Sequence, residues 1–195
     1  EVYLLDYDDG TIHELVHNKV DTQQHPFPRR LSEAGVFASI PDHRLAEGVV
    51  EFSVNAEMWA DHATALRAIG IPGQKTIKLH PASANVAGSS FLRIMDFPQD
   101  TVLVKTISLE REHGKPASRQ RLETQILHFK GLVVRGYTYA WNDAQTDADL
   151  VPADGMDRTL TVLDPSAAGG QRDQVWRYPS RSECLRCHNP WAEYK

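Results

Sequence analysis

The sequence predicts a mainly β fold of the α+β class, with an antiparallel sheet and a few short helices, one of them near the C-terminus. Most apolar segments are short, rich in β-branched and aromatic residues, and bounded by turn-forming residues. The two longest, residues 120–129 and 132–141, are joined by Lys130-Gly131, which favours an antiparallel pair.

The chain is predicted to have three parts. Residues 1–17 have the pattern of a β-hairpin with an Asp-Gly turn. Residues 18–30 are polar and contain Pro26 and Pro28, which is typical of a linker. A β-rich domain is expected over residues 31–195.

Within the β-rich domain, residues 31–37 predict a short helix or turn, and the apolar spacing over 57–69 predicts a helix. Beyond residue 72 the pattern changes to strands. The candidate strands are residues 76–79, 91–95, 101–110, 120–129, 132–141, 159–163 and 174–178.

Composition excludes several classes of protein. The 195 residues are 41% hydrophobic and 24% charged, with a formal net charge of −5, as in ordinary globular domains. No basic stripe with interleaved aromatic residues indicates nucleic-acid binding, and no apolar run is long enough to span a membrane. The chain also opens without a secretory signal peptide, so if haem is attached outside the cytoplasm we expect the signal to have been removed or to lie in an upstream domain.

The strongest functional signal is the run Cys184-Leu185-Arg186-Cys187-His188. A Cys-x-x-Cys-His run is the attachment motif of haem c, in which two thiols add to the vinyl groups and the histidine binds the iron. Ser180 and Glu183 form a capping-box pattern that predicts a helix starting just before Cys184, and Pro190 would end it. The predicted cofactor is therefore haem c, held by Cys184, Cys187 and His188, with His188 as the metal ligand.

Two other interpretations of the motif remain open. A structural zinc site needs four ligands, whereas the motif supplies three. A redox dithiol of the thioredoxin type is expected in a βαβ setting, which this β-rich pattern does not provide. The chain would then be a β-rich interaction module with a Cys-x-x-Cys redox or metal clip.

Five side chains of the predicted sheet region are candidates for contact with the cofactor. Lys105 alternates with Leu103 and Ile107, so it either snorkels at a sheet edge or faces a partner. The other four are aromatic and either pack in the core or line the haem pocket: Tyr137, Tyr139, Trp141 and Trp176.

No local pattern selects a second axial ligand. The candidate donors are Met58, Met95, Met156, His62, His80 and His128. His128 has the pattern of a partly buried core histidine. The alternative to a protein ligand is an open distal side, or a ligand beyond Lys195. The chain stops seven residues after His188, before the point where a common cytochrome c has its methionine loop, so we do not expect a complete protein of that kind.

Four longer sequence segments resemble an uncharacterised family of secreted bacterial proteins with a C-terminal Cys-x-x-Cys-His motif. They cover residues 27–33, 97–109, 136–143 and 176–188. Members of that family often follow a sugar-dehydrogenase-like β-propeller, and residues 1–17 are similar to the last hairpin of such a propeller. The resemblance implies that the hairpin is the tail of an upstream propeller, which would act as a redox partner.

A shorter resemblance links Phe-Pro-x-x-Thr-Val-Leu-Val-Lys, residues 97–105, and the late motif to the cytochrome c-prime-beta group. Those proteins hold a five-coordinate haem c against an antiparallel sheet, and hydroxylamine-oxidising relatives cross-link a lysine to the porphyrin. This resemblance implies a proximal His188, an open distal side and Lys105 in the pocket.

The sequence therefore predicts a periplasmic or secreted haem c domain that transfers electrons to or from a dehydrogenase or another redox partner. It is expected to be an electron-transfer domain rather than a catalyst on its own. The alternative within haem proteins is an open site that binds or oxidises a small molecule.

Overall fold

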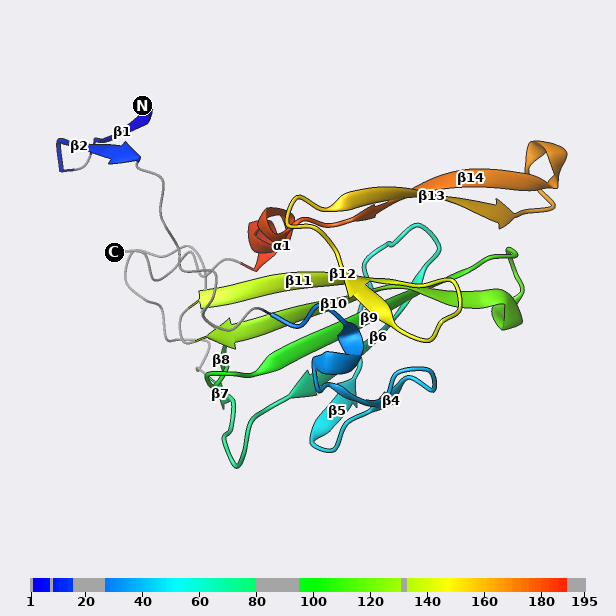
Figure 1. Cartoon of the computed structure of the whole chain (residues 1–195), viewed down its shortest axis with the longest axis horizontal. Coiled ribbons are helices and arrows are strands. Elements are labelled where there is room, and N and C mark those ends of the chain that lie inside the picture. Colours follow the sequence, from blue (N-terminus) through cyan, green and yellow to red (C-terminus); the bar gives the residue numbers. More distant parts are fainter. Residues whose placement is uncertain (1, 8, 16–26, 80–94, 131–132, 189–195) are drawn as a thin grey trace.

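A computed structural model of the chain describes residues 2–7, 9–15, 27–79, 95–130 and 133–188. The predicted mainly β fold is confirmed. A six-stranded antiparallel sheet forms the centre, in the order β12-β11-β10-β9-β6-β5 (Figure 1). Its strands are β5 (Val49–Phe52), β6 (Thr64–Gly70), β9 (Val102–Glu110), β10 (Arg119–Lys130), β11 (Val133–Trp141) and β12 (Ala148–Leu150).

The other strands of the described residues form two-stranded antiparallel pairs. These are β1 (Val2–Asp6) with β2 (Thr11–Leu15), β3 (Phe37–Ser39) with β4 (Arg44–Leu45), β7 (Lys78–Leu79) with β8 (Met95–Asp96), and β13 (Met156–Leu163) with β14 (Gln171–Tyr178). The helical segments are the 3-10 turns η1 (Leu31–Glu33), η2 (Pro116–Ser118) and η3 (Ala168–Gly170), and the α-helix α1 (Arg181–Cys187).

The N-terminal hairpin, the turn at η1 and the antiparallel β10–β11 pair agree with the sequence predictions. The predicted helix over residues 57–69 is wrong, because residues 64–70 form β6, which pairs with β5 on one side and β9 on the other. The end of the predicted linker packs on the sheet. Phe27 stacks on Tyr137 with ring centroids 3.4 Å apart, and the Leu150 N–H donates to the Arg29 carbonyl at 2.8 Å.

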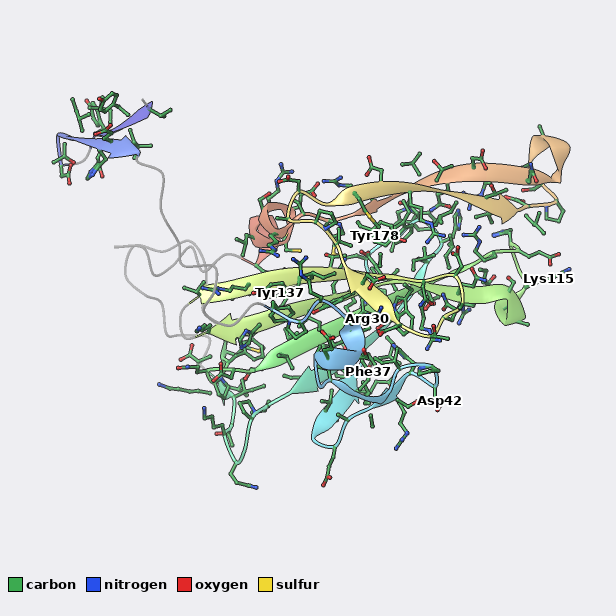
Figure 2. All side chains as sticks on the ribbon, in the orientation of Figure 1. Arg30, Phe37, Asp42, Lys115, Tyr137 and Tyr178 are labelled. Carbon is green, nitrogen blue, oxygen red and sulfur yellow. The ribbon has the colours of Figure 1, made fainter. Side chains whose placement is uncertain are left out.

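Alternation along the strands gives the central sheet two different faces. One, the N-terminal face, is covered by η1 and the β3–β4 region, which pack against Val104, Ile126 and Tyr139. The other, the helix face, is partly covered by the β13–β14 hairpin, whose Leu160 and Tyr178 belong to a second core cluster (Figure 2).

The helix face is covered unevenly along β9. Ile107 and Leu109 are buried under the β13–β14 hairpin, whereas Leu103 and Lys105, on the same face, lie beyond it and line a pocket. Helix α1 packs on β11 beside that uncovered part (Figure 1). The fold therefore leaves a hollow between the C-terminal helix and the sheet.

Candidate cofactor site

The helix that carries the Cys-x-x-Cys-His motif begins where the capping box predicts. The Glu183 N–H donates to Ser180 Oγ at 3.1 Å, and the Ser180 N–H donates to Glu183 Oε2 at 2.7 Å. Arg177 also donates to Glu183 Oε2, at 2.9 Å. Hydrogen bonds from Arg177 and Ser180 lower the pKa of Glu183 to about 2, so the carboxylate that closes the cap is ionised at neutral pH. Three local contacts thus fix the first turn of α1.

A glycine sets the distance between α1 and the sheet. A Cβ added to Gly136 of β11 would lie 2.4 Å from the Cβ of Cys184 and 2.9 Å from its Sγ. Beside this contact, Thr138 Oγ1 donates to the Pro179 carbonyl at 3.1 Å. The strand and the helix therefore come close together at the first cysteine of the motif, where β11 has no side chain.

Both cysteines are free thiols, Cys184 partly buried and Cys187 exposed. Burial raises the pKa of Cys184. Partial burial, and then the positive charge of Lys105, lower the pKa of His188, which favours the neutral imidazole that binds metals. The three motif side chains all line the same pocket.

The pocket lies on the helix face and has a volume of about 510 Å³, within the range of cofactor sites. Its walls come from α1 and from the chain that follows β5, and its floor comes from β6, β9 and β10. The lining residues are Phe52, Val54, Ala56, Met58, Arg67, Leu103, Val104, Lys105, Gln125, Ile126, Leu127, Pro179, Glu183, Cys184, Cys187 and His188.

Polar side chains stand side by side in the floor. Strand register places Arg67 opposite Lys105 and Lys105 opposite Gln125. Arg67 pairs with Glu57 at 2.7 Å. Partial burial and the neighbouring Arg67 lower the pKa of Lys105. Because β9 is an interior strand, the prediction that Lys105 snorkels at a sheet edge is wrong.

A buried carboxyl group lies next to this floor. Glu123 is 2% exposed, and its Oε1 accepts a hydrogen bond from Gln125 at 3.0 Å. Its Oε2 makes no hydrogen bond of normal geometry within the described residues. Burial raises the pKa of Glu123 to about 8, although Lys105 opposes the shift, so the neutral acid predominates at pH 7.

The rim of the pocket is apolar and open to solvent. Met58 is 88% exposed, the lining residues Phe52 and Val54 are also exposed, and so is Trp59, the next residue after Met58 in the chain. An exposed apolar group of this size is typical of a surface that another molecule covers.

The four aromatic candidates do not line the pocket. Tyr137, Tyr139 and Trp141 are buried on the N-terminal face, because they alternate with Gly136 along β11. Tyr139 donates to the Pro28 carbonyl and Trp141 donates to Thr124 Oγ1, each at 2.9 Å. Trp176 is buried in the second core cluster.

Met58 is the described candidate axial donor that lines the pocket. Met95 lies on β8, Met156 packs against the second core cluster, and His128 Nε2 lies 3.2 Å from Asp100 Oδ1. His62 packs against the rings of Trp59 and His113. His80 and Pro190 lie outside the described residues.

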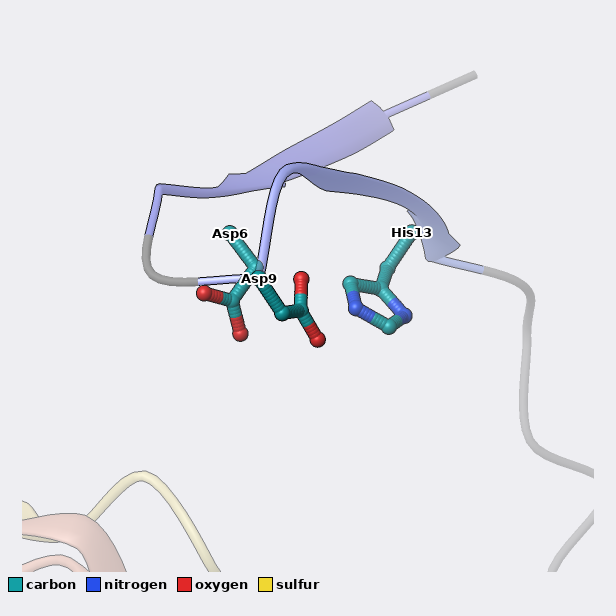
Figure 3. Close-up of side chains that lie close together, drawn as sticks. All are labelled: Asp6, Asp9 and His13. Atoms are coloured by element: carbon teal, nitrogen blue, oxygen red, sulfur yellow. The ribbon is translucent and has the colours of Figure 1, made fainter.

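A separate group of possible metal ligands lies on the N-terminal hairpin. Asp6, Asp9 and His13 project from the same side, with ligand atoms within 4.8 Å of one another (Figure 3). Asp9 Oδ1 already accepts hydrogen bonds from Thr11. All three side chains are at or near the surface, and the arrangement is common without an ion.

No family model matches the chain, and no curated protein or solved structure is significantly similar to it. Among the helices of the described residues, none has the length and apolar character needed to cross a bilayer.

Sequence reasoning missed two contributors to the site. The apolar spacing over residues 57–69 places Arg67 on a helix, so the sequence does not indicate its pairing with Lys105 across β6 and β9. Glu123 shares its alternation with Arg121 and Gln125, a polar row that resembles a solvent-facing side. Its burial follows from a register shift in β10 between Arg121 and Glu123 and from the cover of the second core cluster.

Proposed function

We propose that this chain is a haem c domain that transfers single electrons. One observation carries the proposal: both cysteines and the histidine of a Cys-x-x-Cys-His motif line one wall of an apolar-rimmed pocket of about 510 Å³. Cys184 and Cys187 would hold the haem through thioether bonds and His188 would bind its iron. When bound, the haem supplies a metal that gains and loses one electron.

The remaining lining also suits haem. The apolar side chains of the rim would lose their contact with water against a flat porphyrin, and each fully buried one contributes about 1.5–3 kcal/mol. Arg67 and Lys105 carry positive charge that is complementary to the two carboxylates of haem. The pocket thus combines the two kinds of surface that haem presents.

The alternatives to haem have less support. A zinc clip needs four converging ligands. Among the described residues, the possible metal ligands that cluster closely belong to the N-terminal hairpin and not to the motif. A redox dithiol needs a thiol whose pKa is lowered, whereas burial raises the pKa of Cys184.

We place the protein in the periplasm or outside the cell, because covalent attachment of haem c takes place there. The proposed redox partner is a dehydrogenase, such as the sugar-dehydrogenase-like propeller that accompanies the family this chain resembles. A second function, binding or oxidation of a small molecule at an open distal site, is favoured by the polar floor of Arg67, Lys105 and Gln125.

The test is a pyridine haemochrome spectrum of the full chain, matured in a host with the haem c attachment machinery. We expect a spectrum of the two-thioether type, altered or lost in Cys184→Ala and Cys187→Ala. Arg186→Ala, which changes the interior of the motif but neither thiol, is the matched control and should keep the wild-type spectrum. Folded protein with reduced thiols and no covalent haem would overturn the proposal and make the clip the leading alternative.

A further inference from the structure

The wall opposite α1 contains a donor that suits the second axial position of a haem. The chain after β5 runs without regular secondary structure, and Val54, Ala56 and Met58 all line the pocket. The chain bends at residues 55 and 56, and side chains from both sides of the bend reach the pocket. Met58 therefore belongs to the lining together with its neighbours rather than by chance.

The sheet separates this wall from the motif by a fixed distance. Helix α1 packs on β11, and the segment that carries Met58 follows β5 at the far edge. These two strands are four interstrand steps apart, roughly 19 Å at ordinary strand spacing. Helix α1 and the segment after β5 extend from these two strands over the floor, so that the His188 and Met58 side chains line the same pocket.

Contacts at the base of the segment hold it to the floor. Glu57, next to Met58, pairs with Arg67 at 2.7 Å, and the Arg67 side chain is only 14% exposed. Met58 itself is 88% exposed, so neither core cluster uses its side chain. Large apolar side chains that are exposed at a pocket rim often mark a surface that a ligand covers. A bound ligand would therefore explain the exposure of Met58.

We propose that Met58 supplies the sixth ligand of the haem iron, opposite His188. The inference rests on the proposed function and makes the domain six-coordinate, which favours electron transfer over chemistry at an open site. A thioether binds iron without losing a proton, and Met/His ligation is the arrangement that raises the reduction potential of cytochromes c.

The competing donor within the pocket is the Lys105 amine. It must lose its proton before it can bind iron, a step that a thioether does not need. The other described methionines, Met95 and Met156, do not line the pocket. Met58 is therefore the neutral soft donor that this pocket provides.

The experiment compares Met58→Leu with Met95→Leu, which removes another exposed thioether, one that does not line the pocket. Haem content is first measured by haemochrome, so that loss of attachment is separated from loss of ligation. In the ferric wild-type and Met95→Leu proteins we expect the far-red sulfur-to-iron charge-transfer band. In Met58→Leu the band should be lost, and the ferrous protein should gain rapid carbon monoxide binding.

A wild-type protein that carries haem but lacks the band, or a Met58→Leu protein that keeps it, would overturn the Met58 assignment and leave the haem proposal intact. Loss of the features of the sixth ligand in Lys105→Ala instead would assign the position to the lysine. Absence of haem from the folded wild-type protein would overturn both proposals. Methyl-labelled methionine in the ferrous wild-type protein gives a readout without mutation, because an iron-bound methyl group moves far upfield.

Discussion

The contact between Gly136 and Cys184 allows a sharp test of how the motif helix is held. In Gly136→Ala the new methyl carbon would lie 2.4 Å from the Cys184 Cβ, whereas nonbonded carbons stay about 3.5 Å apart or more, so α1 must retreat by about 1.1 Å. The Cys184 Cβ is fixed to the helix backbone and cannot rotate away. We therefore expect a loss of about 1–3 kcal/mol in the free energy of unfolding.

Gly70→Ala is the matched control, because Gly70 is also a sheet glycine without a positive φ. Its added Cβ would meet the Val102 and Val49 methyl groups at 3.1 and 3.4 Å, which shifts of a few tenths of an ångström can relieve. Both variants gain the same small benefit from a less flexible unfolded chain. Urea unfolding should show the difference, and the melting temperature of Gly136→Ala should fall by roughly 2–12 °C for a chain of this size. Wild-type stability and haem content in Gly136→Ala would refute the close approach of α1 to the sheet.

Two further predictions concern the cap of α1 and the buried acid. Ser180→Ala removes the acceptor for the Glu183 N–H, and should cost about 1 kcal/mol in urea unfolding relative to the exposed control Ser53→Ala; equal stabilities would contradict the role of the cap. The pKa of Glu123 is raised to about 8 in the folded protein, so between roughly pH 4.5 and pH 8 the folded state binds more protons than the unfolded one. Stability from this group is present below that window and is lost as the pH rises through it. Glu123→Gln should flatten the pH dependence of unfolding between pH 5 and pH 8, and an unchanged slope would show that the acid is ionised in the fold.

Local signals in the sequence predicted the elements that local chemistry determines. The capping box places the start of α1 because Ser180 and Glu183 satisfy each other's backbone groups within one turn. The β10–β11 pair follows from two long strand patterns joined by a short turn. Neither result depends on the rest of the chain.

The prediction over residues 57–69 failed for the opposite reason. Ala65, Leu66 and Ile69 have helical spacing, and Ala, Leu and Arg are good helix formers. In the fold, Ala65 and Leu66 pack on opposite faces of the sheet, and β6 pairs with strands on both sides. Backbone pairing with β9, which lies more than 30 residues away in the sequence, outweighs the local preference.

The pocket exists because the β13–β14 hairpin covers only part of the helix face, and no local sequence pattern encodes how far that cover extends. On the helix face, the β13–β14 hairpin covers Ile107 and Leu109 but leaves Leu103 and Lys105 uncovered on the same strand. Another β-rich domain could bury the whole face under a second sheet. In this chain β14 instead leads through Pro179 into α1, which brings the three motif side chains to the uncovered end.

The proposed haem would complete this second layer. The apolar rim is exposed to water, and a lysine and an arginine lie at the pocket floor. A purely aliphatic cover would bury these two charges without partners, which is costly. A porphyrin is large and flat, is apolar over most of its surface and carries carboxylates at one edge, so it would satisfy both parts. Thioether bonds to Cys184 and Cys187 would then make the cover permanent, and the domain would reach its full stability only after attachment.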